Sequence, residues 1–215
     1  MAYSVKNQYF VFIAIAILTS GLAGPRSHAV AGSSDCDRAL SESNKAPGES
    51  DFVQVKKFRI KSSLLTSREV LVALPRGKAP KNGWPVVVYY QGSIFKSSFN
   101  WPEWSPMGGY YESQTLRELV AAGFAVVVPR ATLNLAWVTN ASLFYELSSD
   151  YYFLNNVFAA IRDKKFGPIN SKKKFAAGMS SGGYNTSRMA VSFPGEFQAL
   201  VIHSASYATC LGALR

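Results

Sequence analysis

The chain has 215 residues, which suggests one domain of ordinary size, and 48% of its residues are hydrophobic, enough for a core. Its formal net charge is +10, and basic residues gather in patches such as Lys172, Lys173 and Lys174. Such patches could bind a polyanion, but no nucleic-acid-binding motif accompanies them. We therefore interpret them as a solvated basic surface and expect no nucleic-acid partner.

Residues 1–31 have the pattern of a secretory signal peptide. Lys6 gives a positive start, residues 9–18 are apolar, and Ala29-Val30-Ala31 is a cleavage site of the A-x-A type. The apolar stretch is shorter than the ~20 residues that a membrane span needs, although an uncleaved N-terminal anchor is the alternative. We expect a secreted protein, extracellular or periplasmic, with no membrane contact after cleavage.

The expected export affects how the two cysteines are interpreted. Cysteines usually pair in an oxidising compartment, so Cys36 and Cys210 could form a bridge, or each could have lost another partner. Two cysteines and two histidines, one of them in the leader, form no metal-ligand cluster. We expect no metal and no cofactor.

Residues 32–50 are polar and are interpreted as a flexible lead-in to a domain over residues 51–215.

From residue 51 the chain alternates predicted strands and helices. Apolar runs predict strands over 52–60, 68–74, 84–90, 124–128, 175–177 and 198–202. Helices are predicted over 112–123, 149–165 and 183–193, the second of them capped by Ser149. This alternation predicts an α/β fold with a doubly wound, mostly parallel sheet.

Residues Gly178-Met179-Ser180-Ser181-Gly182 match the G-x-S-x-G pattern of a nucleophile elbow, a serine at a sharp strand-to-helix turn. A serine in a glycine-rich turn is the alternative, but an apolar run precedes the motif and a plausible helix follows it. Both glycines are expected because a Cβ there would clash with neighbouring backbone. Ser180 is the candidate nucleophile, and the Ser181 N–H is a candidate oxyanion donor.

The loop after the strand 84–90 is placed to supply a second oxyanion donor. It begins Gln91-Gly92-Ser93, and a glycine there lets the backbone turn sharply towards the site. We expect the Ser93 N–H to be the donor, with Gly92 as the alternative. An ordinary strand-to-helix turn would have the same sequence.

Aromatic residues gather in loops that leave the C-terminal ends of predicted strands, the edge where open α/β sheets bind ligands. The candidate substrate-binding residues are Phe95, Trp101, Trp104, Tyr110 and Trp137. Aromatic side chains there suit an apolar substrate or an apolar polymer surface. About half of the loop aromatics could equally fold over the edge of the core.

From about Tyr145 onward, and more loosely before it, the sequence resembles the extracellular medium-chain-length polyhydroxyalkanoate depolymerases of bacteria. The resemblance rests on residues 145–151, 166–171, 178–195 and 204–210, and the doubled serine followed by Gly-Gly-Tyr-Asn-Thr-Ser-Arg-Met is its most specific part. It implies an α/β-hydrolase fold, Ser180 as nucleophile and cleavage of ester bonds in insoluble polyesters of 3-hydroxy acids. The expected partner is such a polyester or another apolar ester.

The sequence departs from this pattern after the elbow. In α/β-hydrolases an acid and then a histidine follow the serine, whereas residues 197–215 hold no Asp or Glu and His203 is their one histidine. We expect His203 to be a strand-end residue rather than the base, and the last strands to be missing, as in a C-terminally truncated depolymerase. The alternatives are a feruloyl or lipase-like esterase, a catalytically inactive polyester-binding remnant and, less favoured, a basic binder of polyanions.

Overall fold

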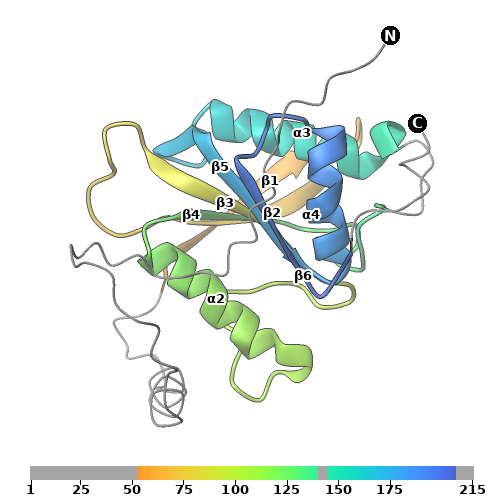
Figure 1. Cartoon of the computed structure of the whole chain (residues 1–215), viewed down its shortest axis with the longest axis horizontal. Coiled ribbons are helices and arrows are strands. Elements are labelled where there is room, and N and C mark those ends of the chain that lie inside the picture. Colours follow the sequence, from red (N-terminus) through yellow and green to blue (C-terminus); the bar gives the residue numbers. More distant parts are fainter. Residues whose placement is uncertain (1–52, 140–144, 207–215) are drawn as a thin grey trace, which may run out of the picture. The chain divides into compact units, whose positions relative to one another are not determined.

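The computed structural model describes residues 53–139 and 145–206, and within them a six-stranded sheet runs in the order β1-β2-β4-β3-β5-β6 (Figure 1). The strands are β1 (Val55–Lys61), β2 (Ser67–Ala73), β3 (Trp84–Tyr90), β4 (Ala125–Pro129), β5 (Ile169–Met179) and β6 (Ala199–His203). β2 pairs antiparallel with β1 and with β4, and the pairs from β4 through β6 are parallel. The predicted mostly parallel α/β sheet is confirmed.

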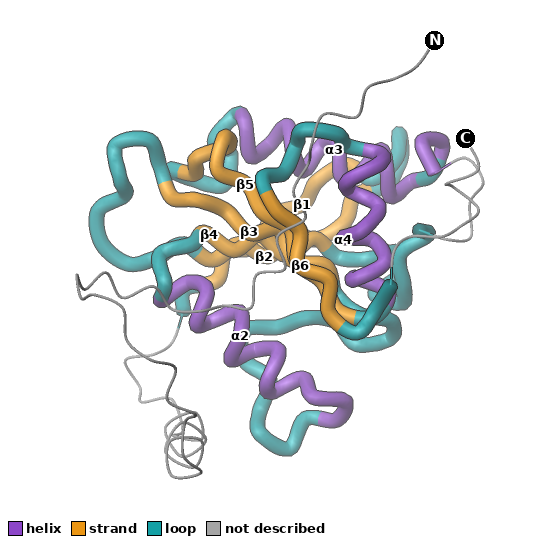
Figure 2. The backbone as a smooth tube through the Cα atoms, in the orientation of Figure 1, coloured by secondary structure: helices purple, strands orange, loops and turns teal. Residues whose placement is uncertain are grey.

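Helices lie on both faces of the sheet, which forms the middle layer in Figure 2. They are η2 (Pro106–Gly108), α2 (Gly109–Ala121), η3 (Tyr145–Leu147), α3 (Ser149–Arg162) and α4 (Ser181–Ser192). The cap of α3 is Ser148 rather than the predicted Ser149, because the Ser148 hydroxyl accepts a hydrogen bond from the Tyr151 N–H at 3.1 Å.

The central strands read as continuous apolar runs because both of their faces are buried. In β4, Ala125 and Val127 belong to the larger core cluster, which α3 and α4 cover, whereas Val126 and Val128 belong to the smaller cluster under α2. Alternate residues of a strand point to opposite faces. A strand covered by helices on both sides therefore needs an apolar residue at every position.

β5 is longer than its predicted apolar end, since it also contains the run of lysines. Lys174 is only 2% exposed. Its ammonium group pairs with Glu196 and lies over the rings of Phe158 and Phe197, 5.0 and 5.7 Å from their centroids. Aromatic faces and a carboxylate make burial of this cation tolerable. The local sequence, which looks like a solvated loop, conceals this arrangement.

Several predictions concern parts of the chain other than 53–139 and 145–206. The signal peptide, the lead-in over 32–50 and the two cysteines lie outside the described residues. Within the described ranges, none of the helices combines the length and the hydrophobicity that crossing a bilayer requires.

Candidate active site

Ser180 is the single residue between the end of β5 and the start of α4, and it has φ 54° and ψ −122°. A φ in this range is uncommon for any residue other than glycine. The turn is held because the Ser180 N–H donates to the carbonyl of His203 at 3.0 Å. The side chain is exposed and makes no capping hydrogen bond to α4. The expected sharp turn is therefore present, with its hydroxyl open to solvent.

The two glycines of the motif are required because a side chain at either position would clash with neighbouring backbone. Their backbone angles do not themselves require glycine. A Cβ on Gly178 would lie 2.4 Å from the carbonyl oxygen of Gly182, and a Cβ on Gly182 would lie 2.0 Å from that of Tyr90. Neither glycine has a positive φ. α4 can pack this closely on the end of β3 only without those side-chain carbons.

Two backbone segments adjoin Ser180. Ser181 opens α4, and the first N–H groups of a helix have no partner within it. A Cβ built on Gly92 would lie 3.7 Å from the Ser180 Cβ and 3.5 Å from the Met179 carbonyl oxygen, so residues 91–93 run directly beside the turn. Ser93, the predicted donor, is the next residue and is half-buried.

Gln91 fastens residues 91–93, the predicted oxyanion segment, to the loop 131–138. Its buried side chain donates from Nε2 to the carbonyl of Asn134 at 3.2 Å and accepts from the N–H of Ala131 at 3.4 Å. The backbone carbonyl of Gln91 accepts a hydrogen bond from the Nε1–H of Trp137 at 3.0 Å. Two loops about 40 residues apart in sequence are thus joined by hydrogen bonds that are buried or partly buried.

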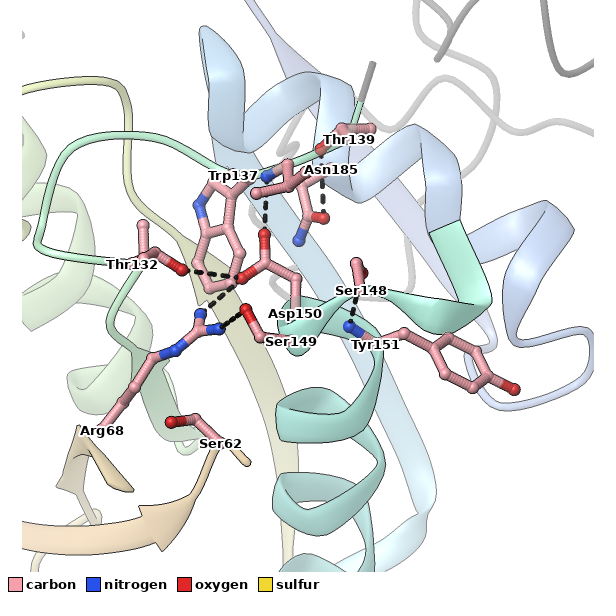
Figure 3. Close-up of polar contacts among 12 residues, drawn as sticks. Ser62, Arg68, Thr132, Trp137, Thr139, Ser148, Ser149, Asp150, Tyr151 and Asn185 are labelled. Atoms are coloured by element: carbon pink, nitrogen blue, oxygen red, sulfur yellow. Dashed lines mark hydrogen bonds and ion pairs between the residues drawn. The ribbon is translucent and has the colours of Figure 1, made fainter. Parts of the chain in front are cut away.

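Asp150 anchors the same loop from the other side (Figure 3). Its fully buried carboxylate accepts from Arg68 at 2.5 Å, from the Thr132 hydroxyl at 3.3 Å and from the Val138 N–H at 2.6 Å. Arg68 also donates to Ser149 at 2.9 Å and lies 4.6 Å from the centroid of the Phe153 ring. The loop 131–138 is therefore held both to the oxyanion segment and to the start of α3.

Side-chain polar atoms near the start of α4 are incompletely satisfied. The Ser181 Oγ and the Asn185 Nδ2 are buried and have no hydrogen-bond partner among the described residues. Asn185 Oδ1 accepts from Thr139 and Tyr145, each at 3.3 Å. Because the Ser181 hydroxyl is buried, it is not open to a ligand at Ser180. The sequence singled out Ser181 for that N–H and gave no sign of Asn185.

The predicted substrate-binding aromatics separate into exposed and buried groups. Trp104 is 83% exposed, while Phe95 and Trp101 are half-buried against each other with ring centroids 4.9 Å apart. Trp137 and Tyr110 are only 6% and 7% exposed, and Trp137 packs 5.3 Å from Tyr90 in the larger core cluster. Both rings are therefore largely covered by the protein itself, and a role for them in substrate binding stays a prediction.

The residue that would take the Ser180 proton is not identified in the described part of the chain. The exposed His203 ring has its Nδ1 3.4 Å from the Ser204 hydroxyl, and the described residues place no carboxylate in hydrogen-bonding or ion-pair contact with it. The same ranges contain no group of three or more His, Cys, Asp or Glu side chains arranged to hold a metal ion.

Comparison with known proteins finds one curated relative and many similar folds. The chain is 50% identical over 157 residues to the poly(3-hydroxyoctanoate) depolymerase of Pseudomonas fluorescens, a match covering 71% of this chain. It covers only 56% of that protein, so the chain spans little more than half of the relative's length. No protein-family model matches.

Two solved structures share the fold. The S-formylglutathione hydrolase FrmB of Staphylococcus aureus has a TM-score of 0.50 and 15% identity over 74% of this chain and 65% of that chain. The BES protein of Bacillus cereus has a TM-score of 0.50 and 16% identity over 76% of this chain and 66% of that chain. At such identities the likeness concerns the fold alone. The chain therefore has the α/β-hydrolase fold and, as its motifs predicted, is a homologue of a polyhydroxyalkanoate depolymerase.

Proposed function

We propose that this protein hydrolyses carboxylic esters with Ser180 as nucleophile, and that its substrate is an insoluble polyester of medium-chain-length 3-hydroxy acids. The observation that carries the proposal is the exposed Ser180 at a turn with positive φ beside the N-terminus of α4. A strained residue kept exposed at such a turn is typical of a functional site.

The chemistry follows from this geometry. The Ser180 oxygen loses its proton to a base and bonds to the ester carbonyl carbon, and the carbonyl oxygen becomes an oxyanion. The N–H groups of Ser181 and Ser93 stabilise that charge, together with the positive end of α4. The alkoxide of the polymer then leaves with a proton, and water releases the acyl group from Ser180. We do not assign the base to His203, because no acid among the described residues orients its ring.

The polyester substrate is supported by the name of the 50% identical relative. It is also supported by exposed apolar side chains in the loops after β3 and β4, Ile94 at 72% and Leu133 at 81% exposure. The signal-peptide pattern of residues 1–31 supports secretion, which places the enzyme where an insoluble polymer is reachable.

The decisive experiment compares wild type with Ser180→Ala and, as matched control, Ser181→Ala. Each protein is treated with a fluorophosphonate probe, with poly(3-hydroxyoctanoate) particles and with soluble p-nitrophenyl esters. We expect Ser180→Ala to lose labelling and to lower hydrolysis by about 10³-fold or more, while Ser181→Ala keeps both within about 10-fold, because only its N–H takes part.

Other outcomes would favour the alternatives. Hydrolysis of soluble esters without release of 3-hydroxyoctanoate from particles would indicate an esterase for small substrates. A folded wild-type chain that adsorbs to the particles but neither hydrolyses them nor takes the label would indicate an inactive polyester-binding protein. Equal labelling of wild type and Ser180→Ala would contradict the assignment of the nucleophile.

A further inference from the structure

Two exposed apolar residues in the loops after β3 and β4 have backbone conformations that favour glycine. Ile94 has φ 68° and is 72% exposed, and Leu133 has φ 53° and is 81% exposed. A positive φ is a clear outlier for a β-branched or bulky residue. Neither side chain offsets this strain by packing in the core, because both are largely in solvent.

The turn that carries Leu133 shows what the fold alone would select. Leu133 and Asn134 both have positive φ, and the N–H of Leu135 donates to the Thr132 carbonyl at 2.9 Å. Thr132 and Ala136 pair across it as an antiparallel bridge. This is a tight turn of the primed type, in which asparagine and glycine are the preferred central residues. Asn134 fits that preference, whereas Leu133 does not.

The turn of Ile94 follows the segment beside Ser180, and a backbone hydrogen bond joins it to the loop of Leu133. Ile94 follows Gly92 by two residues, so its Cα is within ~7.6 Å of the Cα of Gly92, which adjoins Ser180. The N–H of Ile94 donates to the carbonyl of Leu135 at 2.5 Å, which joins the two turns, and Leu135 is itself 53% exposed. We call Ile94, Leu133 and Leu135 the apolar rim.

The apolar rim carries no charge in a chain whose net charge is +10. Residues 91–95 and 131–138 contain no Asp, Glu, Lys or Arg. A polyanion would find no cation there, whereas an alkyl surface would meet only apolar and neutral groups. The chemistry of the rim therefore matches an uncharged aliphatic ligand.

We propose that the apolar rim is the surface by which the protein contacts the alkyl side chains of a solid polyester, and that Ile94 and Leu133 are strained for this purpose. The inference rests on the proposed function. Strain that brings no packing to the free protein is explained if the exposed side chains are buried on binding the polymer.

The test separates adsorption from catalysis. Ile94→Gly and Leu133→Gly are made in the Ser180→Ala background, and depletion of each protein from solution by poly(3-hydroxyoctanoate) particles is measured, together with its thermal midpoint. Lys164→Gly is the matched control, because Lys164 is also exposed with φ 55° but lies between α3 and the start of β5, at the other end of that strand from Ser180.

We expect each rim variant to weaken adsorption by about 10-fold, which corresponds to losing the burial of much of an aliphatic side chain. The thermal midpoint should be unchanged or higher, since glycine suits a positive φ. Lys164→Gly should leave adsorption unchanged. Adsorption that stays at the parent level in folded Ile94→Gly and Leu133→Gly would overturn the proposal, and so would a lowered midpoint, which would show that these side chains serve the fold. Because the parent carries Ser180→Ala, the result is independent of whether Ser180 is the nucleophile.

Discussion

Two buried ion pairs of this protein serve different purposes. Arg68 and Asp150 meet near the candidate site, where the carboxylate also holds Thr132 and Val138 of the loop that fastens the oxyanion segment. Lys174 of β5 meets Glu196, which lies between α4 and β6, and its ammonium group also contacts the rings of Phe158 and Phe197. The first pair therefore holds a loop backbone in place, whereas the second mainly packs against aromatic side chains. A buried charge is hard to replace when backbone groups depend on it.

The largest effect should come from Asp150→Ala, which leaves Arg68 buried without its partner and the Val138 N–H without its acceptor. We expect a loss of about 3–5 kcal/mol in the free energy of unfolding. If ester hydrolysis is established, its kcat should fall by about 10²-fold, because the loop no longer fixes the oxyanion segment. Urea unfolding and steady-state kinetics measure the two losses. Asp163→Ala, an exposed change at the end of the same helix, is the control. A variant of wild-type stability would refute the anchoring role.

Replacing Glu112, another buried ionisable residue, should have a smaller effect on stability that depends on pH. Burial raises the pKa of Glu112 above its ordinary value of 4.5, although hydrogen bonds from the Ser97 and Tyr89 hydroxyls and the charge of Arg130 act in the opposite direction. The folded state then holds this proton more tightly than the unfolded state. The stability that this tight proton binding contributes is lost as the pH rises from 4.5 through the folded-state pKa.

Glu112→Gln removes this titration while keeping an oxygen that can accept from Ser97, whose hydroxyl donates to Glu112 at 2.8 Å. We expect the free energy of unfolding of this variant to depend less on pH than that of wild type. Above the folded-state pKa of Glu112, the two free energies should differ by ~1 kcal/mol. Urea midpoints taken from about pH 4 to pH 8 test this. The exposed Glu103→Gln is the matched control, and parallel profiles for wild type and Glu112→Gln would contradict the expectation.

The smallest effect should come from Lys174→Met, which sharpens the contrast with Asp150→Ala. Burial lowers the pKa of Lys174, and the hydrogen bond and charge of Glu196 act against that shift. Methionine can pack against the same two rings, and Glu196 keeps Arg162 as a partner at 3.0 Å. We expect a change of at most ~1 kcal/mol in stability and none in kcat.

Lys172→Met, on an exposed position of the same strand, is the control, and chemical denaturation is the measurement. A loss as large as that of Asp150→Ala would show that the two ion pairs are equivalent, and the distinction between them would fail.

Local pattern accounts for the strands, the helices and the turn at Ser180. Apolar runs such as Val86, Val87 and Val88 predict buried strands because both faces of the sheet are covered. The two glycines of the elbow are equally local, since their spacing specifies a close approach of α4 to β3. The sequence alone therefore determined the fold class and the position of the candidate nucleophile.

Only the tertiary structure decided which side chains surround that nucleophile. Gln91 and Trp137 are 46 residues apart and meet through one hydrogen bond, and Trp137, predicted to contact substrate, is buried because Tyr90 lies beneath it. Elsewhere in the protein, Lys174 is buried because Glu196 and two aromatic rings contact its side chain. Ile94 and Leu133 showed no signal in the sequence, because their strain is visible only in the backbone angles that long-range contacts impose. Contacts between segments distant in the chain leave no periodic pattern, so their outcome depends on the folded protein.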